Sequence, residues 1–234
     1  MAIHDWPAAG HDERGGPPIV SPQHGGARRL THEFSRNSSA FSAASRPATT
    51  VMLLGLSHEG VEVFTTAQAP PGRLEQLRAL IDQAFDGDFS DDDWEHTTGG
   101  WHAVALDGDV PVAHAAVVER VLEVDGHPFR TGYVEGVGTL PSRQGHGLGT
   151  IAMTEVMAVL RSRFELGALS SGLHRFYERI GWERWQGPAS VRDGDRLVRT
   201  PEEDDGIMVL RFGPSLTVDL HSAISCEARR GDDW

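Results

Sequence analysis

The stretch of sequence that decides the fold runs from residue 131 to residue 149 and reads TGYVEGVGTLPSRQGHGLG. Its first part, Thr131–Val137, is predicted to be a strand that follows an Asp-Gly turn at residues 125–126. Its last part, residues 144–149, has alternating glycines just before an apolar stripe at helical spacing. Such a loop can hold a pyrophosphate, because main-chain N–H groups and the helix dipole converge on one point.

A glycine-rich turn with a purely structural role is the alternative for this loop. The glycines fall at 145, 147 and 149, which is not the spacing of a Rossmann dinucleotide fingerprint. The chain has no lysine, which excludes a Walker A phosphate loop.

The sequence on both sides of this stretch predicts alternating strands and helices. Before it, strands are expected at Val61–Thr65, Trp101–Leu106 and Val110–Val124, and an amphipathic helix at Arg73–Phe85. After it come a helix over about Thr150–Phe164, a strand at Leu166–Leu169, a short helix with Leu173, Phe176, Tyr177 and Ile180 on one face, and a late strand at Ile207–Phe212. This order indicates an α+β sandwich around a largely antiparallel sheet.

The composition favours a folded, acidic protein. The formal net charge of -13 argues against a nucleic-acid partner and is compatible with a cationic one, although solubility alone could explain it. No apolar run approaches the roughly 20 residues of a membrane span. The single cysteine, Cys226, cannot form an intrachain disulfide, which fits a reducing cytoplasm.

The first 57 residues differ from the rest in composition. They hold clustered Gly, Pro and Ser without periodicity, so residues 1–57 are predicted to be a disordered extension or the product of a start site placed too far upstream, with Met52 as one alternative. One domain with its C-terminal tail is expected over residues 58–234.

Acidic residues gather at 88–95, 202–205 and 232–233. Each group has an ordinary explanation. Ser90 and Asp93 have the spacing of a helix capping box, the second run could be a solvated turn, and a charged terminus is often disordered.

Two motifs together resemble the GNAT superfamily of acetyltransferases. Residues 144–149 fit its Arg/Gln-x-x-Gly-x-Gly/Ala signature, and residues 176–182, FYERIGW, fit its Phe-Tyr-x-x-x-Gly-aromatic pattern. The resemblance implies the GNAT fold: a mixed, mostly antiparallel sheet with helices on both faces and a splayed central strand pair that binds CoA. It also implies acetyl-CoA as co-substrate, with the pantetheine on Val137, Gly138 and Thr139 and the pyrophosphate on Gln144, Gly145, His146, Gly147, Leu148 and Gly149.

From about residue 60 to the terminus the chain resembles the aminoglycoside 2'-N-acetyltransferases. The shared segments include Gly87-Asp88-Phe89, residues 93–97, His114-Ala115-Ala116, residues 132–137 and the closing Gly-Asp-x-Trp. Carboxylates suit such a polycation, because they accept charge-assisted hydrogen bonds from ammonium groups. The resemblance implies that these residues face the drug: Asp88, Asp93, Glu135, Gly136, Ser170, Asp204 or Asp205, Asp232 and the terminal carboxylate of Trp234.

The resemblance also implies catalytic roles. Glu135 would accept the proton of the attacking amine through a water, and Tyr177 would protonate the leaving thiolate. A main-chain N–H of the splayed strand would polarise the thioester carbonyl. The residues alone leave open that Glu135 pairs with an arginine and that Tyr177 only packs in the core. A covalent route through Cys226 is disfavoured because no motif surrounds it, and the histidine spacing predicts no metal.

The expected function is therefore acetyl transfer from acetyl-CoA to the 2'-amine of an aminoglycoside, by direct attack in a ternary complex, conferring antibiotic resistance. A cytoplasmic homodimer without a nucleic-acid or membrane partner is expected. The alternatives are a GNAT enzyme for another cationic amine, a non-catalytic acyl-CoA-binding module, and a charged interaction protein that binds no CoA.

Overall fold

A long central strand, β3 (Val110–Val124), organises the sheet in the computed structural model, which describes residues 59–234. β3 pairs antiparallel with β2 (Trp101–Asp107) along its first half and with β4 (His127–Thr139) along most of its length. The extension expected over residues 1–57 lies outside the described residues.

The described strands form one sheet of ten, and most neighbours are antiparallel. The order is β6-β9-β5-β4-β3-β10-β7-β8, with β1 and β2 continuing from the first half of β3. The remaining strands are β1 (Glu59–Thr65), β5 (Leu166–Ser170), β6 (Glu183–Arg184), β7 (Ala189–Asp193), β8 (Arg196–Arg199), β9 (Ile207–Arg211) and β10 (Ile224–Glu227). Only β4–β5 and β7–β10 run parallel, so the predicted mixed sheet is confirmed.

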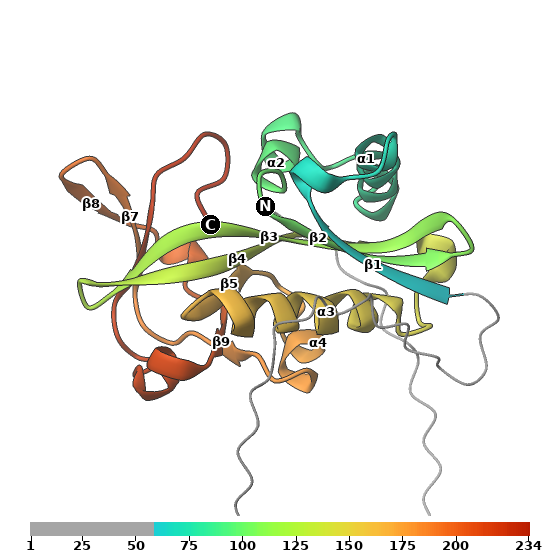
Figure 1. The fold of residues 1–234 in the computed structure, drawn as a ribbon. Coiled ribbons are helices and arrows are strands. Elements are labelled where there is room, and N and C mark those ends of the chain that lie inside the picture. Colours follow the sequence, from blue (N-terminus) through green and yellow to red (C-terminus); the bar gives the residue numbers. More distant parts are fainter. Residues whose placement is uncertain (1–58) are drawn as a thin grey trace, which may run out of the picture. The chain divides into compact units, whose positions relative to one another are not determined.

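Helices cover both faces of this sheet (Figure 1). On one face lie α1 (Arg73–Ala84) and α2 (Asp91–His96), and on the other lie α3 (Leu148–Arg163) and α4 (His174–Arg179). The apolar stripe of α3 packs on the sheet in a cluster that includes Val117, Val134 and Tyr177. No helix within residues 59–234 has the length and apolar character needed to cross a membrane.

Most predicted elements are present with small shifts at their ends. The capping box is confirmed, since Ser90 N donates to Asp93 Oδ2 (2.9 Å) and Asp93 N to Ser90 Oγ (3.1 Å). α3 begins at Leu148 rather than Thr150, so the exposed loop ends at Gly147, whose φ is 81°. β4 is longer than predicted, because residues 127–130 continue the pairing with β3.

The sequence interpretation missed four strands, β6, β7, β8 and β10. β7 and β8 form a hairpin around Asp193-Gly194-Asp195, which is the same turn signal that was recognised at residues 107–109. β10 gave no comparable signal. It is four residues long and depends on pairing with β7 and β3, which lie far away in the sequence.

The C-terminal tail is ordered, so the disordered terminus considered above is wrong. Cys226 and Trp234 are buried in one cluster with Tyr133. The buried Arg120 holds the tail by donating to the carbonyls of Glu227 (3.0 Å) and Asp233 (2.7 Å). The tail is therefore fixed against the sheet beside β4.

Candidate active site

The splayed strand pair is formed by β4 and β5. The two strands pair only from Thr131–Leu166 to Tyr133–Ala168, whereas β4 continues to Thr139 and β5 to Ser170. Beyond Tyr133 the ladder between them has ended. The gap predicted from the resemblance is therefore present, and Glu135 lies at its beginning.

β4 carries a bulge where the gap opens. Ala116 pairs with Glu135 and His114 with Gly138, so Gly136 and Val137 both lie opposite Ala115. Gly136 adopts the left-handed region with φ 55°, and a Cβ there would meet Thr97 at 2.8 Å. Only glycine suits this position, which explains the Glu-Gly-Val sequence at the site.

Glu135 is paired with an arginine from the C-terminal tail. Arg229 Nη1 lies 2.7 Å from Glu135 Oε1, and both side chains are 16% exposed. Burial raises the pKa of Glu135, and the opposing effect of Arg229 is smaller. A carboxylate with a raised pKa lies closer to the range needed to take a proton near neutral pH.

Arg229 is itself held by the tail. Its Nε donates to the Asp232 carbonyl (2.6 Å), its main-chain N donates to Asp233 Oδ1 (2.8 Å), and its guanidinium lies over the Tyr133 ring (5.6 Å). Trp234 N in turn approaches Asp232 Oδ1 (3.4 Å). The tail thereby brings Asp232 near Glu135 and buries Trp234 in the cluster that contains Tyr133, although these residues are about a hundred positions away in sequence.

The segments expected to bind acetyl-CoA lie at the far end of the same gap. Thr139 ends β4, and a Cβ added at Gly149 would lie 3.2 Å from Thr139 Oγ1, so the strand end and the start of α3 are adjacent. The loop residues Gly145, His146 and Gly147 are exposed. The first hydrogen bond of the helix comes from Ile151 N to Gly147 O, so the preceding N–H groups have no partner within α3.

Tyr177 lies on α4, which covers the same face of the sheet as α3 and the face opposite to α1 and α2 (Figure 1). Its side chain is buried in the cluster that contains Val134, and its hydroxyl interacts with the side chain of Ser171, just after β5. Burial raises the pKa of Tyr177, so the phenol stays protonated at neutral pH. A protonated phenol packed beside Val134 of β4 can donate a proton.

Some acidic residues of the α1–α2 region make structural contacts and others are exposed. Asp88 is exposed on the loop between the helices, whereas Asp93 caps α2 through Ser90. Asp92, which sequence reasoning did not single out, pairs with Arg230 of the tail (3.1 Å). α2 therefore also contacts the tail at this edge of the site.

The acidic residues at 202–205 lie in different environments. Asp204 accepts from Ala189 N (2.9 Å) and pairs with Arg199, and Asp205 is fully exposed near Arg184. Neither is brought together with Glu135. Glu203, which sequence reasoning missed, interacts with the side chain of Ser170, and burial and then the charge of Asp232 raise its pKa.

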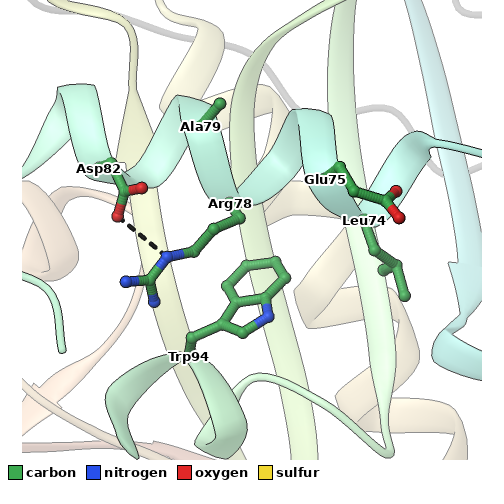
Figure 2. A pocket seen from close by; sticks show the side chains of 6 residues that line it. All are labelled: Leu74, Glu75, Arg78, Ala79, Asp82 and Trp94. Carbon is green, nitrogen blue, oxygen red and sulfur yellow. Dashed lines mark ion pairs between the residues drawn. The ribbon is translucent and has the colours of Figure 1, made fainter. Parts of the chain in front are cut away.

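A surface pocket lies between α1 and α2, and its lining contains none of the predicted site residues. Figure 2 shows its lining residues, Leu74, Glu75, Arg78, Ala79, Asp82 and Trp94. Arg78 donates to the carbonyls of Phe89 and Ser90, each at 2.9 Å, and pairs with Asp82 at 3.0 Å. This arginine fixes the loop that presents Asp88.

Two buried histidines lie under the bulge. His102 and His114 are fully buried, and burial lowers the pKa of His102 to about 4 and that of His114 to about 3. In the unfolded chain both imidazoles bind protons below about pH 6.5. In the folded chain they stay neutral until the pH approaches these lower values.

We expect the free energy of unfolding to fall as the pH drops from 6.5 towards 4, by up to about 1.4 kcal/mol per pH unit for each buried histidine. Urea denaturation at pH 7, 6 and 5 measures this. His102→Asn should reduce the dependence by about half, because His114 remains, and His221→Asn, at an exposed histidine, should leave it unchanged. An unfolding free energy that is constant between pH 7 and pH 5 would contradict the prediction.

Comparison with known proteins identifies the family of the chain. The GNAT acetyltransferase domain model matches residues 67–185. The chain belongs to the GNAT acetyltransferase family and has its fold.

Its sequence is similar to the aminoglycoside 2'-N-acetyltransferase of Mycolicibacterium fortuitum, with 43% identity over 164 residues, 68% of this chain and 84% of the relative. A crystal structure of the GNAT family N-acetyltransferase YhbS from Escherichia coli, in complex with CoA, shares the fold. That comparison has a TM-score of 0.53 and 16% identity, and it covers 79% of this chain and 93% of the other.

Proposed function

We propose that the protein transfers the acetyl group of acetyl-CoA to the 2'-amine of an aminoglycoside, and that this modification confers resistance to the drug. The observation that carries the proposal is that the C-terminal tail brings Arg229 and Asp232 to Glu135, just beyond the point where the pairing of β4 with β5 ends. The 43% identity to an aminoglycoside 2'-N-acetyltransferase supports the same acceptor.

In the proposed ternary complex the pantetheine lies along Val137, Gly138 and Thr139, and residues Gln144 to Gly149 hold the pyrophosphate. The acceptor amine attacks the thioester carbon, so a C–N bond forms as the C–S bond breaks. Glu135 takes the proton of the amine through a water, and Tyr177 gives its proton to the departing thiolate. Positioning both substrates in one gap supplies part of the rate.

Direct transfer is favoured over a covalent enzyme intermediate because Cys226 is poorly suited to act. The thiol is buried, and burial raises its pKa to about 11. A thiolate is the nucleophilic form, and it is scarce at neutral pH under these conditions. Initial-velocity patterns test the order of events: intersecting lines support the ternary complex, and parallel lines contradict it.

The cationic drug would be bound by Asp88, Asp93, Gly136, Ser170, Asp232 and the terminal carboxylate of Trp234, together with Glu203. Asp204 is a weaker candidate because Arg199 and Ala189 already occupy its oxygens. Asp205 is exposed, so it is proposed to attract the cationic drug only through its charge. The proposed domain is residues 58–234, and a cytoplasmic homodimer is proposed from the resemblance alone.

Glu203 and Asp204 form a matched pair for testing the acceptor site. Glu203→Gln should raise KM for the drug by about 10- to 100-fold, because a charge-assisted hydrogen bond contributes on the order of 1.5–3 kcal/mol. Asp204→Asn should leave KM within about 2-fold and lower the melting temperature instead. Steady-state kinetics and thermal denaturation measure both, and the opposite pattern would assign the contact to Asp204.

Product analysis tests the function itself. The protein, acetyl-CoA and an aminoglycoside with a 2'-amine should give a singly acetylated drug, with the 2'-nitrogen identified by NMR. Acetylation at another amine would support an aminoglycoside N-acetyltransferase but contradict the proposed 2'-position.

A further inference from the structure

A continuous hydrogen-bond chain runs from the α2–β2 loop to the bulge of β4. Gly99 N donates to Thr66 Oγ1 (2.9 Å), Thr66 Oγ1 lies 2.9 Å from His102 Nε2, and His102 Nδ1 lies 3.0 Å from His114 Nε2. His114 Nδ1 lies 2.7 Å from the Gly136 carbonyl oxygen. Both imidazoles are fully buried.

The chemistry of the two ends fixes the direction of every bond. A carbonyl oxygen only accepts, so His114 must donate from Nδ1 to Gly136. A neutral imidazole has one N–H, so His114 Nε2 accepts from His102 Nδ1–H, and His102 Nε2 accepts from the Thr66 hydroxyl. The last acceptor, the Gly136 carbonyl, has no proton to donate further. The hydrogen-bond chain therefore orients these groups and does not conduct protons.

The Gly136 carbonyl is the group that the bulge displaces from the regular ladder. His114 pairs with Gly138 and Ala116 with Glu135, so the Gly136–Val137 peptide lies in the irregular part of the β3–β4 pairing. His114 gives this carbonyl a buried partner. It thereby fixes the plane of the peptide unit between Gly136 and Val137.

The peptide unit is planar and trans, so its C=O and N–H point in opposite directions. With the Gly136 carbonyl directed at His114, the Val137 N–H points away from the histidines. The β4–β5 ladder has already ended at Tyr133–Ala168, so β5 does not pair with β4 at Val137. That N–H belongs to the segment where the thioester of acetyl-CoA is proposed to bind.

We propose that His114, supported by His102 and Thr66, is a positioning residue for acetyl transfer: it orients the Gly136–Val137 peptide so that the Val137 N–H polarises the thioester carbonyl. This inference rests on the proposed binding of acetyl-CoA along β4. Neither histidine touches the reacting atoms in this arrangement. They act on catalysis only by fixing the orientation of the Gly136–Val137 peptide.

Two substitutions of similar size separate positioning from packing. His114→Asn keeps an N–H donor near the place of Nδ1, and His114→Leu fills the space without a donor. We expect kcat to fall about 10- to 100-fold in His114→Leu, somewhat less than the loss on deleting an oxyanion donor outright. His114→Asn should retain most of kcat, and KM for acetyl-CoA should stay within about 3-fold in both.

The carbonyl stretch of bound acetyl-CoA, labelled with carbon-13 and followed by infrared difference spectroscopy, gives a readout independent of turnover. The shift to lower frequency seen with the wild-type protein should persist in His114→Asn and diminish in His114→Leu. Equal shifts in all three proteins, or better activity in Leu than in Asn, would overturn the inference. Absence of acetyl-CoA binding to the wild-type protein would instead overturn the proposed function. If His114→Leu does not fold, the same comparison at His102, Asn against Leu, takes its place.

Discussion

Glu135→Gln is expected to lower kcat by about 10²- to 10⁴-fold, the range associated with loss of a general base. The amide keeps the size of the side chain but cannot accept the proton of the attacking amine. Binding of acetyl-CoA should be unchanged, because the proposed pantetheine and pyrophosphate contacts begin at Val137. Steady-state kinetics together with calorimetric titration of CoA measure both quantities.

The pH profile distinguishes this role from a structural one. Burial raises the pKa of Glu135, so the carboxylate form needed as a base is lost as the pH falls through that raised value. Wild-type kcat should therefore decline on the acidic side, and this decline should be absent from the residual activity of Glu135→Gln.

The ion pair with Arg229 requires its own control. Glu135→Gln leaves the guanidinium in a largely buried place without its carboxylate, which could loosen the tail. The double variant Glu135→Gln/Arg229→Gln removes both charges. If its kcat recovers to within about 3-fold of wild type, the loss in the single variant came from the unpaired arginine, and Glu135 is not the base.

Tyr177→Phe is expected to lower kcat by about 10²- to 10³-fold, because the thiolate would leave without a proton donor. The ring would stay in its apolar cluster, so the free energy of unfolding should change by only about 1 kcal/mol, the contribution of one hydrogen bond. Stopped-flow detection of the thiol and urea denaturation measure the two effects.

Ser171→Ala is the matched control, since it removes the hydroxyl that interacts with Tyr177 and keeps the phenol. It should retain kcat within about 10-fold. Equal losses in Ser171→Ala and Tyr177→Phe would mean that the Tyr177 hydroxyl has only a structural role.

The sequence predicted the central part of the fold because its signals are local. The stretch from Thr131 to Gly149 contains the strand, the glycine turn and the start of the helix in one continuous segment. Alternation and helical spacing likewise located β1, β2, β3, α1 and α3 to within a few residues. The strands β5 and β9 were also predicted. Of the four strands that were missed, β6 and β10 are short and are held by partners distant in sequence, whereas the β7–β8 hairpin carries a local turn signal that was overlooked.

The candidate site was harder to predict, because contacts between distant residues determine it. A run of four acidic residues does not reveal that Arg199 engages Asp204 while Glu203 turns towards Ser170. The pairing of Glu135 with Arg229 could only be left as an open alternative. His114 was noted as part of a shared segment, but its role emerges only from the cross-strand hydrogen bonds to His102 and Gly136.

The most direct test of the account is the rate of CoA thiol release with two aminoglycosides that differ only at the 2'-position, one with an amine and the other with a hydroxyl. Rapid release is expected with the 2'-amine, and release at the background hydrolysis rate is expected with the 2'-hydroxyl. Background release with both drugs, by protein that binds acetyl-CoA, would contradict the aminoglycoside assignment.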